Sequence, residues 1–362
     1  MRSGVAAPAR DARIDVRRQG SRPVTDLSVL DLSPITEGGG PAQSMRNSLD
    51  LARRAEALGY RRYWVAEHHN IPGIASAATA VVIAHIAGGT SSIRVGAGGI
   101  MLPNHAPLVI AEQFGTLDAL HPGRIDLGLG RAPGTDQRTA YALRRTLQGD
   151  PDDFPRDVLE LQGYFRDAGA DEPVQAIPGR GRNVPIWILG SSLYGAQLAA
   201  MLGLPYAFAS HFAPGALLPA LDTYRRSFRP SEQLSAPYAM AGFNVFAAPT
   251  EEEAHLLRTS ARKSTLWLRQ GRPRPLPPPD GEFEKGLSSL ERRMLDEQGA
   301  CSAAGSPETV LRQMEEFVAR TGVDELMVAS QIFDHGARVR SFEIAMEVWS
   351  RRSIPRNRDT TG

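Results

Sequence analysis

The chain has 362 residues, of which 42% are hydrophobic, and it combines a formal net charge of +1 with a single cysteine, Cys301. The near-zero charge gives no electrostatic reason to expect nucleic acid or an anionic membrane as a partner. One cysteine excludes an intrachain disulfide, which is typical of a cytoplasmic protein, and no apolar run approaches the ~20 residues that a membrane-spanning helix needs.

Residues 1–23 are rich in arginine and poor in apolar side chains. They lack the apolar middle of a secretory signal. We therefore expect either a disordered leader or a wrongly assigned start position, and a targeting peptide is the alternative. One folded domain is expected over 24–352, followed by a flexible tail at 353–362.

Apolar segments of strand length alternate with segments of helical periodicity along this domain. The expected strands are Thr25–Leu32, Tyr63–Val65, Ile93–Ala97, Arg124–Leu129, Pro185–Leu189, Tyr206–Ser210, Tyr238–Phe246 and Glu325–Ser330. The expected helices are Met45–Leu58, Ala77–Ile86, Pro107–Leu120, Pro151–Phe165, Leu193–Leu202, Gly215–Phe228, Glu251–Gln270, Ser306–Thr321 and Ala337–Trp349. Ser44 and Thr250 are the expected N-caps of two of them, and Gly59 is an expected helix end.

Eight strands that alternate with helices predict a closed (β/α)8 TIM barrel of the α/β class, with insertions after the fourth and seventh strands. A doubly wound open sheet is the alternative. It is disfavoured because no strand is followed by the Gly-x-Gly-x-x-Gly fingerprint of dinucleotide binding.

The second strand ends abruptly in Glu67, His68 and His69, which are too polar to continue into a core. In βα units the carboxyl ends of the strands carry the chemistry. Neighbouring residues on an extended chain point to opposite faces, so the two histidines are not expected to share a zinc ion, and one of them is expected to face the cleft. The alternative is that both histidines cap a loop or lie half-exposed.

The other strand ends complete the expected rim of the barrel. They are Asp31 and Ser33, Gly98 and Gly99, Gly130 and Arg131, Gly190 to Ser192, Ser210 and His211, and Gln331. Arg131, with Ser191 and Ser192 at a helix N-terminus, suits a phosphate monoester, although the serines are equally consistent with an ordinary N-cap. Gly98 and Gly99 leave a wall without side chains on which a flat group can lie; a barrel bulge is the alternative.

The chain shows no carboxylate pair at glycosidase spacing, no nucleophile elbow and no evident set of three metal ligands. A cofactor is therefore expected to carry the chemistry. The proline-rich segment Arg272–Asp280 cannot be regular structure, and it is either a spacer or a mobile cover over the cleft.

Five segments, in order and with similar spacing, resemble the bacterial-luciferase-like flavin monooxygenases. They are Leu27–Pro34, Trp64–His69, Val95–His105, Arg124–Gly134 and Ile188–Ser192. The resemblance extends from about Thr25 to Trp349 and is closest to the FMN-using branch, which includes oxygenases of aromatic polyketide tailoring.

The resemblance implies roles for individual residues. His68 matches the active-site histidine, which transfers a proton near the flavin. Gly98–Gly99 matches a non-proline cis peptide beneath the flavin ring. Arg131 matches the phosphate-binding arginine and Ser191 its serine partner, within a cofactor-binding loop Gly190–Ser192. No resident metal is implied.

The implied reaction uses reduced FMN and dioxygen, through a flavin C4a-hydroperoxide, to oxygenate a small organic substrate. The absence of a nicotinamide fingerprint implies that a separate flavin reductase supplies the reduced FMN, and the family implies a homodimer. The alternatives are a deazaflavin-dependent oxidoreductase of the same superfamily, a non-catalytic flavin-binding barrel and a metal-dependent barrel hydrolase.

Overall fold

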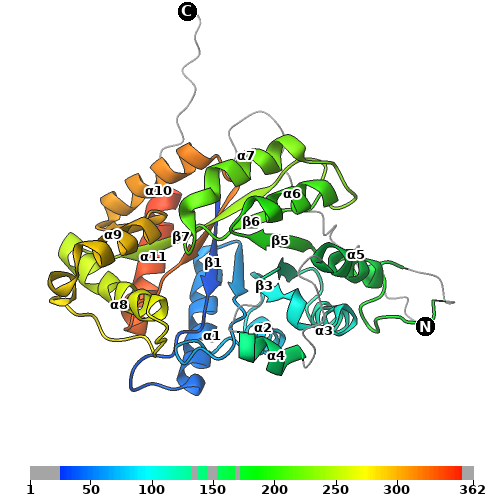
Figure 1. The fold of residues 1–362 in the computed structure, drawn as a ribbon, viewed down its shortest axis with the longest axis horizontal. Coiled ribbons are helices and arrows are strands. Elements are labelled where there is room, and N and C mark those ends of the chain that lie inside the picture. Colours follow the sequence, from blue (N-terminus) through cyan, green and yellow to red (C-terminus); the bar gives the residue numbers. More distant parts are fainter. Residues whose placement is uncertain (1–24, 133–136, 145–152, 168–171, 353–362) are drawn as a thin grey trace, which may run out of the picture.

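The computed structural model describes residues 25–132, 137–144, 153–167 and 172–352, so the predicted leader at 1–23 and tail at 353–362 lie outside the described residues. The strands are β1 (Asp26–Asp31), β2 (Arg62–Val65), β3 (Arg94–Met101), β4 (Ile125–Gly130), β5 (Ile186–Gly190), β6 (Tyr206–Phe208), β7 (Ala239–Ala247), β8 (Ser302–Gly305) and β9 (Glu325–Ala329). The α-helices are α1 (Pro41–Leu58), α2 (Thr79–Gly88), α3 (Pro107–Leu120), α4 (Gln137–Arg144), α5 (Phe154–Phe165), α6 (Leu193–Leu202), α7 (Leu217–Ser227), α8 (Glu251–Arg269), α9 (Ser289–Gln298), α10 (Pro307–Thr321) and α11 (His335–Arg351). Figure 1 shows these helices around the strands.

The strands form one parallel sheet in the order β6-β5-β4-β3-β2-β1-β9-β7-β8, with an additional pairing of β6 with β7. That pairing closes β1 to β7 and β9 into an eight-stranded barrel, which confirms the predicted (β/α)8 fold. The connection after β4 contains α4 in addition to the barrel helix α5, and the connection after β7 contains α8, α9 and β8 in addition to the barrel helix α10. Both predicted insertions are therefore present.

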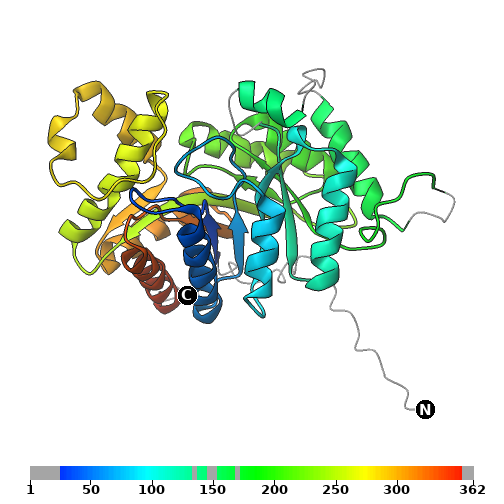
Figure 2. The same cartoon turned by 90° about the horizontal axis from the view of Figure 1, so that it is seen from below.

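Three of these elements were not predicted: α4, α9 and β8. The strand β8 pairs with the second half of β7, from Asn244 opposite Ser302 to Ala247 opposite Gly305. Its sequence is Ser-Ala-Ala-Gly, which has none of the branched or aromatic residues typical of strands. Helices α8 and α9, drawn in yellow, form a lobe at the opposite end of the long axis from α5 (Figures 1 and 2).

The helix caps were predicted with partial success. Gly59 ends α1 with a left-handed φ of 87°, and the Thr250 side chain accepts a hydrogen bond from the Glu253 N–H, as expected. The prediction for Ser44 is wrong, because α1 begins at Pro41, a favoured first helical residue. The buried Ser44 hydroxyl instead donates to the Ser33 carbonyl at 2.6 Å.

The two largest clusters of the apolar core form two layers, and a third, small cluster contains Phe246, Ala304 and Ile332. The larger layer lies between the barrel and its helices, and the smaller one fills the barrel interior around Trp64, Trp187 and Tyr238. The Trp64 and Trp187 ring centroids are 5.1 Å apart in an edge-to-face arrangement. Because side chains alternate along a strand, Arg62 and Trp64 of β2 point into the barrel, whereas Tyr63 and Val65 belong to the outer layer.

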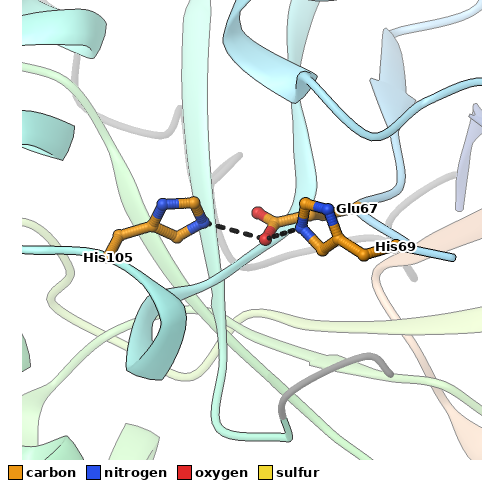
Figure 3. A group of neighbouring side chains, drawn as sticks. All are labelled: Glu67, His69 and His105. Carbon is orange, nitrogen blue, oxygen red and sulfur yellow. Dashed lines mark hydrogen bonds and ion pairs between the residues drawn. The ribbon is translucent and has the colours of Figure 1, made fainter. Parts of the chain in front are cut away.

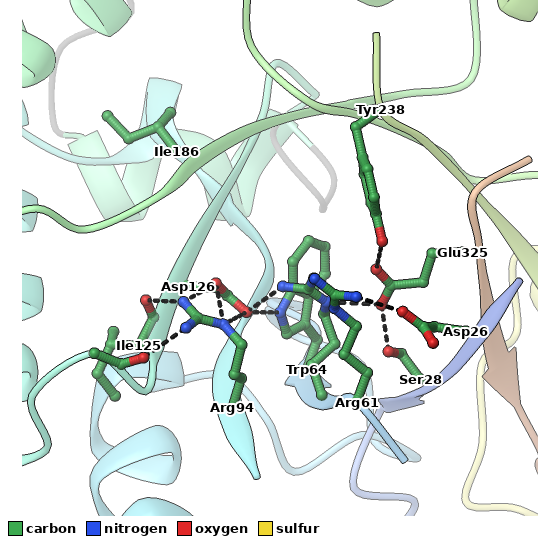
Figure 4. Close-up of polar contacts among 12 residues, drawn as sticks. Asp26, Ser28, Arg61, Trp64, Arg94, Ile125, Asp126, Ile186, Tyr238 and Glu325 are labelled. Carbon is green, nitrogen blue, oxygen red and sulfur yellow. Dashed lines mark hydrogen bonds and ion pairs between the residues drawn. The ribbon is translucent and has the colours of Figure 1, made fainter. Parts of the chain in front are cut away.

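A buried network of charged side chains closes the barrel at the beginning of its strands (Figure 4). Arg62 donates to Asp126 and to Glu325, each at 2.7 Å, and Arg94 donates to Asp126 at 2.6 Å. The Tyr238 hydroxyl donates to Glu325 at 2.9 Å. Each buried carboxylate therefore has a guanidinium partner, which offsets the cost of removing both charges from water.

Among the helices of the described residues, none is both long enough and apolar enough to cross a bilayer.

Candidate functional site

His68 lies just beyond β2 at the carboxyl end of the barrel, and the alternation that turns Arg62 and Trp64 inward directs it toward the barrel mouth. Its Nδ1 atom is buried and has no hydrogen-bond partner among the described residues. Burial lowers the pKa of the imidazole; the carboxylate of Glu67 opposes this effect, and the neighbouring His69 adds to it. The lowered pKa favours the neutral form of this imidazole, and one of its hydrogen-bonding atoms is unused in the described structure.

His211 is a second imidazole in this region, contributed by the loop after β6. Burial, together with the repulsion that would arise if His68 and His211 were both protonated, lowers the pKa of His211 to about 4. Its Nδ1 also has no partner within the part of the chain that the structure describes. The sequence placed His211 on the rim without a role; its proximity to His68 depends on the closure of the barrel.

The Gly98–Gly99 peptide bond is cis, as the resemblance implied. The register between β3 and β4 shifts between Ala97 and Ile100, which is consistent with the alternative of a barrel bulge at this point. A Cβ at Gly98 would crowd Leu30 and Trp64. Packing inside the barrel therefore favours glycine at this position whether or not a ligand binds there. Gly98 nevertheless remains partly exposed, whereas Gly99 is buried.

Arg131 and Ser191 follow strands that are neighbours in the sheet, because Gly130 of β4 pairs with Leu189 of β5. The Arg131 guanidinium lies 4.2 Å from the ring centroid of Tyr194 in the first turn of α6. Ser192 occupies the N-cap position of α6, but its side chain makes no capping hydrogen bond. Arg131, Ser191 and Ser192 are all exposed, so one exposed corner combines a cation with a helix N-terminus.

Two other rim residues are structural. Asp31 is fully buried between the barrel and the helices, where it accepts hydrogen bonds from Tyr63 and Ser48, each at 2.5 Å, and from Arg338 at 2.6 Å. The buried Ser210 hydroxyl donates to the Gly242 carbonyl at 2.6 Å. Neither side chain is available to a ligand.

The structure also assembles three side chains that the sequence analysis did not combine. Glu67 Oε1 accepts from His69 Nε2 at 2.9 Å and from His105 Nε2 at 2.8 Å (Figure 3). Burial by itself would raise the pKa of Glu67, but these two imidazoles and the Met101 N–H hold it below its usual value. His69 and Glu67 are two residues apart and lie on the same side of the extended chain. His68, between them, is expected on the opposite side, which fits the expectation that the two histidines face different ways.

Several loops join across the rim beside β1 and β2. Leu276, from the proline-rich segment, exchanges backbone hydrogen bonds with the loop after β1: its N–H donates to the Ile35 carbonyl at 2.8 Å, and its carbonyl accepts from the Glu37 N–H at 2.9 Å. Pro34 forms a bridge with Ile74 of the loop after β2. Arg272–Asp280 is therefore tied to the rim at Leu276, and both of its predicted roles, as a spacer and as a mobile cover, stay predictions.

A crevice of about 770 Å³ lies elsewhere, between the loop before α7 and helix α9. Phe212, Leu218, Met294 and Cys301 are among its lining residues. It shares no residue with the candidate site.

Comparison with known proteins decides the family. The sequence model of the luciferase-like monooxygenases matches residues 25–325. The chain belongs to this family. It is 52% identical over 322 residues to a luciferase-like monooxygenase of Escherichia coli, with 89% of this chain and 96% of that protein covered. It is 38% identical over 253 residues to the N-acetyl-S-alkylcysteine monooxygenase of Bacillus subtilis, with 68% and 75% covered.

The fold of this luciferase-like monooxygenase is similar to that of apo-MsnO8, with a TM-score of 0.81 and 37% identity. That similarity covers 90% of this chain and 98% of the other. The family resemblance seen in the sequence is thereby confirmed.

Gly242 of β7 provides the space that the His211 ring occupies, because a Cβ at this position would overlap the ring. We expect Gly242→Ala to lower the free energy of unfolding of this luciferase-like monooxygenase by about 1–3 kcal/mol, as overpacking of a core does. Urea unfolding measures the change. Gly163→Ala in α5 is the control, since a Cβ there meets no atom within 4 Å. Equal stability of the Gly242→Ala variant and the wild type would contradict the packing argument.

Proposed function

We propose that this protein is a monooxygenase that uses reduced FMN and dioxygen to oxygenate a small organic substrate. The observation that carries the proposal is the buried, unpartnered Nδ1 of His68 at the barrel mouth. His68 follows β2, and Gly98 lies on the adjacent strand, because Val65 pairs with Ala97. In this proposal His68 is catalytic, and its imidazole transfers a proton at the reacting centre.

The residues present fit FMN. Arg131 and the N-terminus of α6, with Gly190, Ser191 and Ser192, would hold the phosphate, since an exposed guanidinium and free first-turn N–H groups suit an anion. The partly exposed backbone at Gly98, with the buried Gly99 beside it, would support the flat ring. When bound, the flavin supplies the reaction with dioxygen. The protein contributes binding, exclusion of water and the imidazole of His68.

Arg131→Ala is expected to weaken FMN binding by about 10- to 100-fold, because a charge-assisted hydrogen bond to a phosphate contributes about 1.5–3 kcal/mol. Quenching of flavin fluorescence measures the affinity. Arg226→Ala on α7 is the matched control, since Arg226 is exposed and pairs only with the exposed Asp222 in the described structure. Equal affinities of the Arg131→Ala variant and the wild type would remove Arg131 from the proposed site.

Titration with FMN and, separately, with the deazaflavin F420 tests the cofactor. Preferential FMN binding, with dioxygen consumption after photoreduction, supports the proposal. Preferential F420 binding without dioxygen consumption would replace it by a deazaflavin-dependent oxidoreductase. FMN binding without dioxygen consumption, in the presence of a panel of substrates, would leave a non-catalytic flavin-binding barrel. N-acetyl-S-alkylcysteines head that panel, because a relative carries their name.

The partners belong to the same proposal. A separate reductase is proposed to supply reduced FMN, because the sequence has no dinucleotide fingerprint. A homodimer through α2 and α3 is supported by the exposed apolar side chains Val81, Val109 and Leu120. The single cysteine suits a cytoplasmic location.

A further inference from the structure

Glu67, His69 and His105 bring one carboxylate and two imidazoles to a common point between two rim loops. Glu67 and His69 follow β2, whereas His105 follows the short 3-10 helix Leu102–Asn104 after β3. These strands are neighbours in the sheet, so residues 38 positions apart in sequence meet at the carboxyl end of the barrel. Figure 3 shows both rings directed at the same carboxylate oxygen.

The carboxylate is fixed before any ligand arrives. Glu67 is only 1% exposed, and its Oε2 accepts the Met101 N–H at 3.1 Å. Its Oε1 therefore faces the two Nε2 atoms, and one possible ligand atom from each of the three residues lies within 4.8 Å of the others. The His69 and His105 side chains are 15% and 26% exposed, so the set opens toward solvent on their side.

The donor set has the chemistry of a transition-metal site. Two imidazole nitrogens and one carboxylate oxygen are a ligand set of open zinc sites, in which a fourth position holds water or another ligand atom. Zn²⁺ takes these donors at about 2.0–2.2 Å, which places donors about 3.3–3.5 Å apart in a tetrahedron. The present separations of 2.8 and 2.9 Å from Oε1 need to widen by only about half an ångström.

We propose that Glu67, His69 and His105 bind one divalent transition-metal ion, such as Zn²⁺, which links the loops after β2 and β3. The ion would take the Nε2 lone pair of each neutral imidazole, and the proton that now bonds to Oε1 would move to the other ring nitrogen or to solvent. The site is separate from the proposed FMN contacts, and it does not depend on the proposed oxygenation. Asn70, beside it, donates to Thr139 of α4 at 3.1 Å, so the metal-linked loop also contacts the insertion after β4.

Calorimetric titration of the full-length, metal-stripped protein with ZnCl2 tests the proposal. We expect one saturable site per chain, and a loss of affinity of at least tenfold in both His105→Ala and Glu67→Gln. Glutamine keeps an acceptor oxygen for the imidazoles and removes the charge, so this variant remains informative if His105→Ala does not fold. His335→Ala is the matched control, because His335 forms a 2.9 Å imidazole–carboxylate pair with Asp50. That pair is not part of any three-ligand set found among the described residues.

Two further readouts are independent of enzyme activity. Co²⁺ should give the visible absorption of a four- or five-coordinate site in the wild type and in His335→Ala, and lose it in His105→Ala. Zn²⁺ should raise the melting temperature of the wild type and of His335→Ala, and not that of Glu67→Gln. The absence of a one-to-one site, or equal losses in His105→Ala and His335→Ala, would leave only a hydrogen-bonded cluster and overturn the proposal. Neither outcome bears on FMN binding, which is measured separately.

Discussion

Replacing Asp126 by asparagine is expected to lower the free energy of unfolding by about 3–5 kcal/mol, the usual cost of removing one partner from a buried ion pair. Asp126 accepts from Arg62 at 2.7 Å, from Arg94 at 2.6 Å and from the Trp64 indole at 3.1 Å. An asparagine side chain has only one acceptor oxygen. Its NH2 group would face the N–H donors of the arginines and the indole, so some of these donors would lose their acceptor. Arg62, which is 1% exposed, would retain only Glu325 as its carboxylate partner in the described structure.

Urea unfolding at neutral pH measures this loss. Asp222→Asn in α7 is the control, because Asp222 and its partner Arg226 are both exposed and such pairs contribute little. A decrease for Asp126→Asn no larger than that of the control would show that the barrel does not need this buried charge.

The carboxylate of Asp126 should also make the free energy of unfolding depend on pH in the acid range. Burial alone would raise the pKa of Asp126, but Arg94 and Arg62 lower it from 3.8 to about 2. A group whose pKa is lower in the folded state contributes stability that is complete above its unfolded pKa and is lost as the pH falls through its folded pKa. The wild type should therefore lose this contribution between about pH 4 and pH 2, whereas Asp126→Asn should lack that part of the slope.

His68→Ala is expected to slow formation of the oxygenated product by about 100-fold, the lower end of the usual contribution of a positioned proton-transfer group, and to lower the product formed per dioxygen consumed. Hydrogen peroxide should appear in place of the product, while FMN affinity stays within about threefold, because His68 is not among the proposed phosphate contacts. An oxygen electrode, a peroxide assay and product analysis, with reduced FMN and a substrate from the panel, measure the three quantities.

The control for His68 is His121→Ala. His121 lies between α3 and β4, at the end of the barrel opposite the mouth, so its removal should leave product yield unchanged. Unchanged coupling in His68→Ala would remove His68 from the proposed chemistry. A joint loss of FMN binding and coupling would instead make it a structural residue of the cofactor site.

Local patterns in the sequence were sufficient for most of the fold. Apolar strand segments that alternate with helical periodicity predicted all eight barrel strands, and turn and cap residues such as Gly59 and Thr250 predicted helix ends. The failures were α4, α9, β8 and the start of α1. The capping box of Ser288 and Glu291 is a local sequence signal for the start of α9, whereas β8 is a strand only because the edge of β7 offers it a partner.

By itself, the sequence determined the alternation of strands and helices, and with it the rim on which His68, Gly98, Arg131 and Ser191 lie. These depend on periodicity and on chain order. Only the tertiary structure decided that Asp31 turns outward into a buried network, that His211 approaches His68, and that His105 meets Glu67 and His69. The reason is geometric: such contacts join strands that are distant in the chain, and barrel closure with its register brings them together.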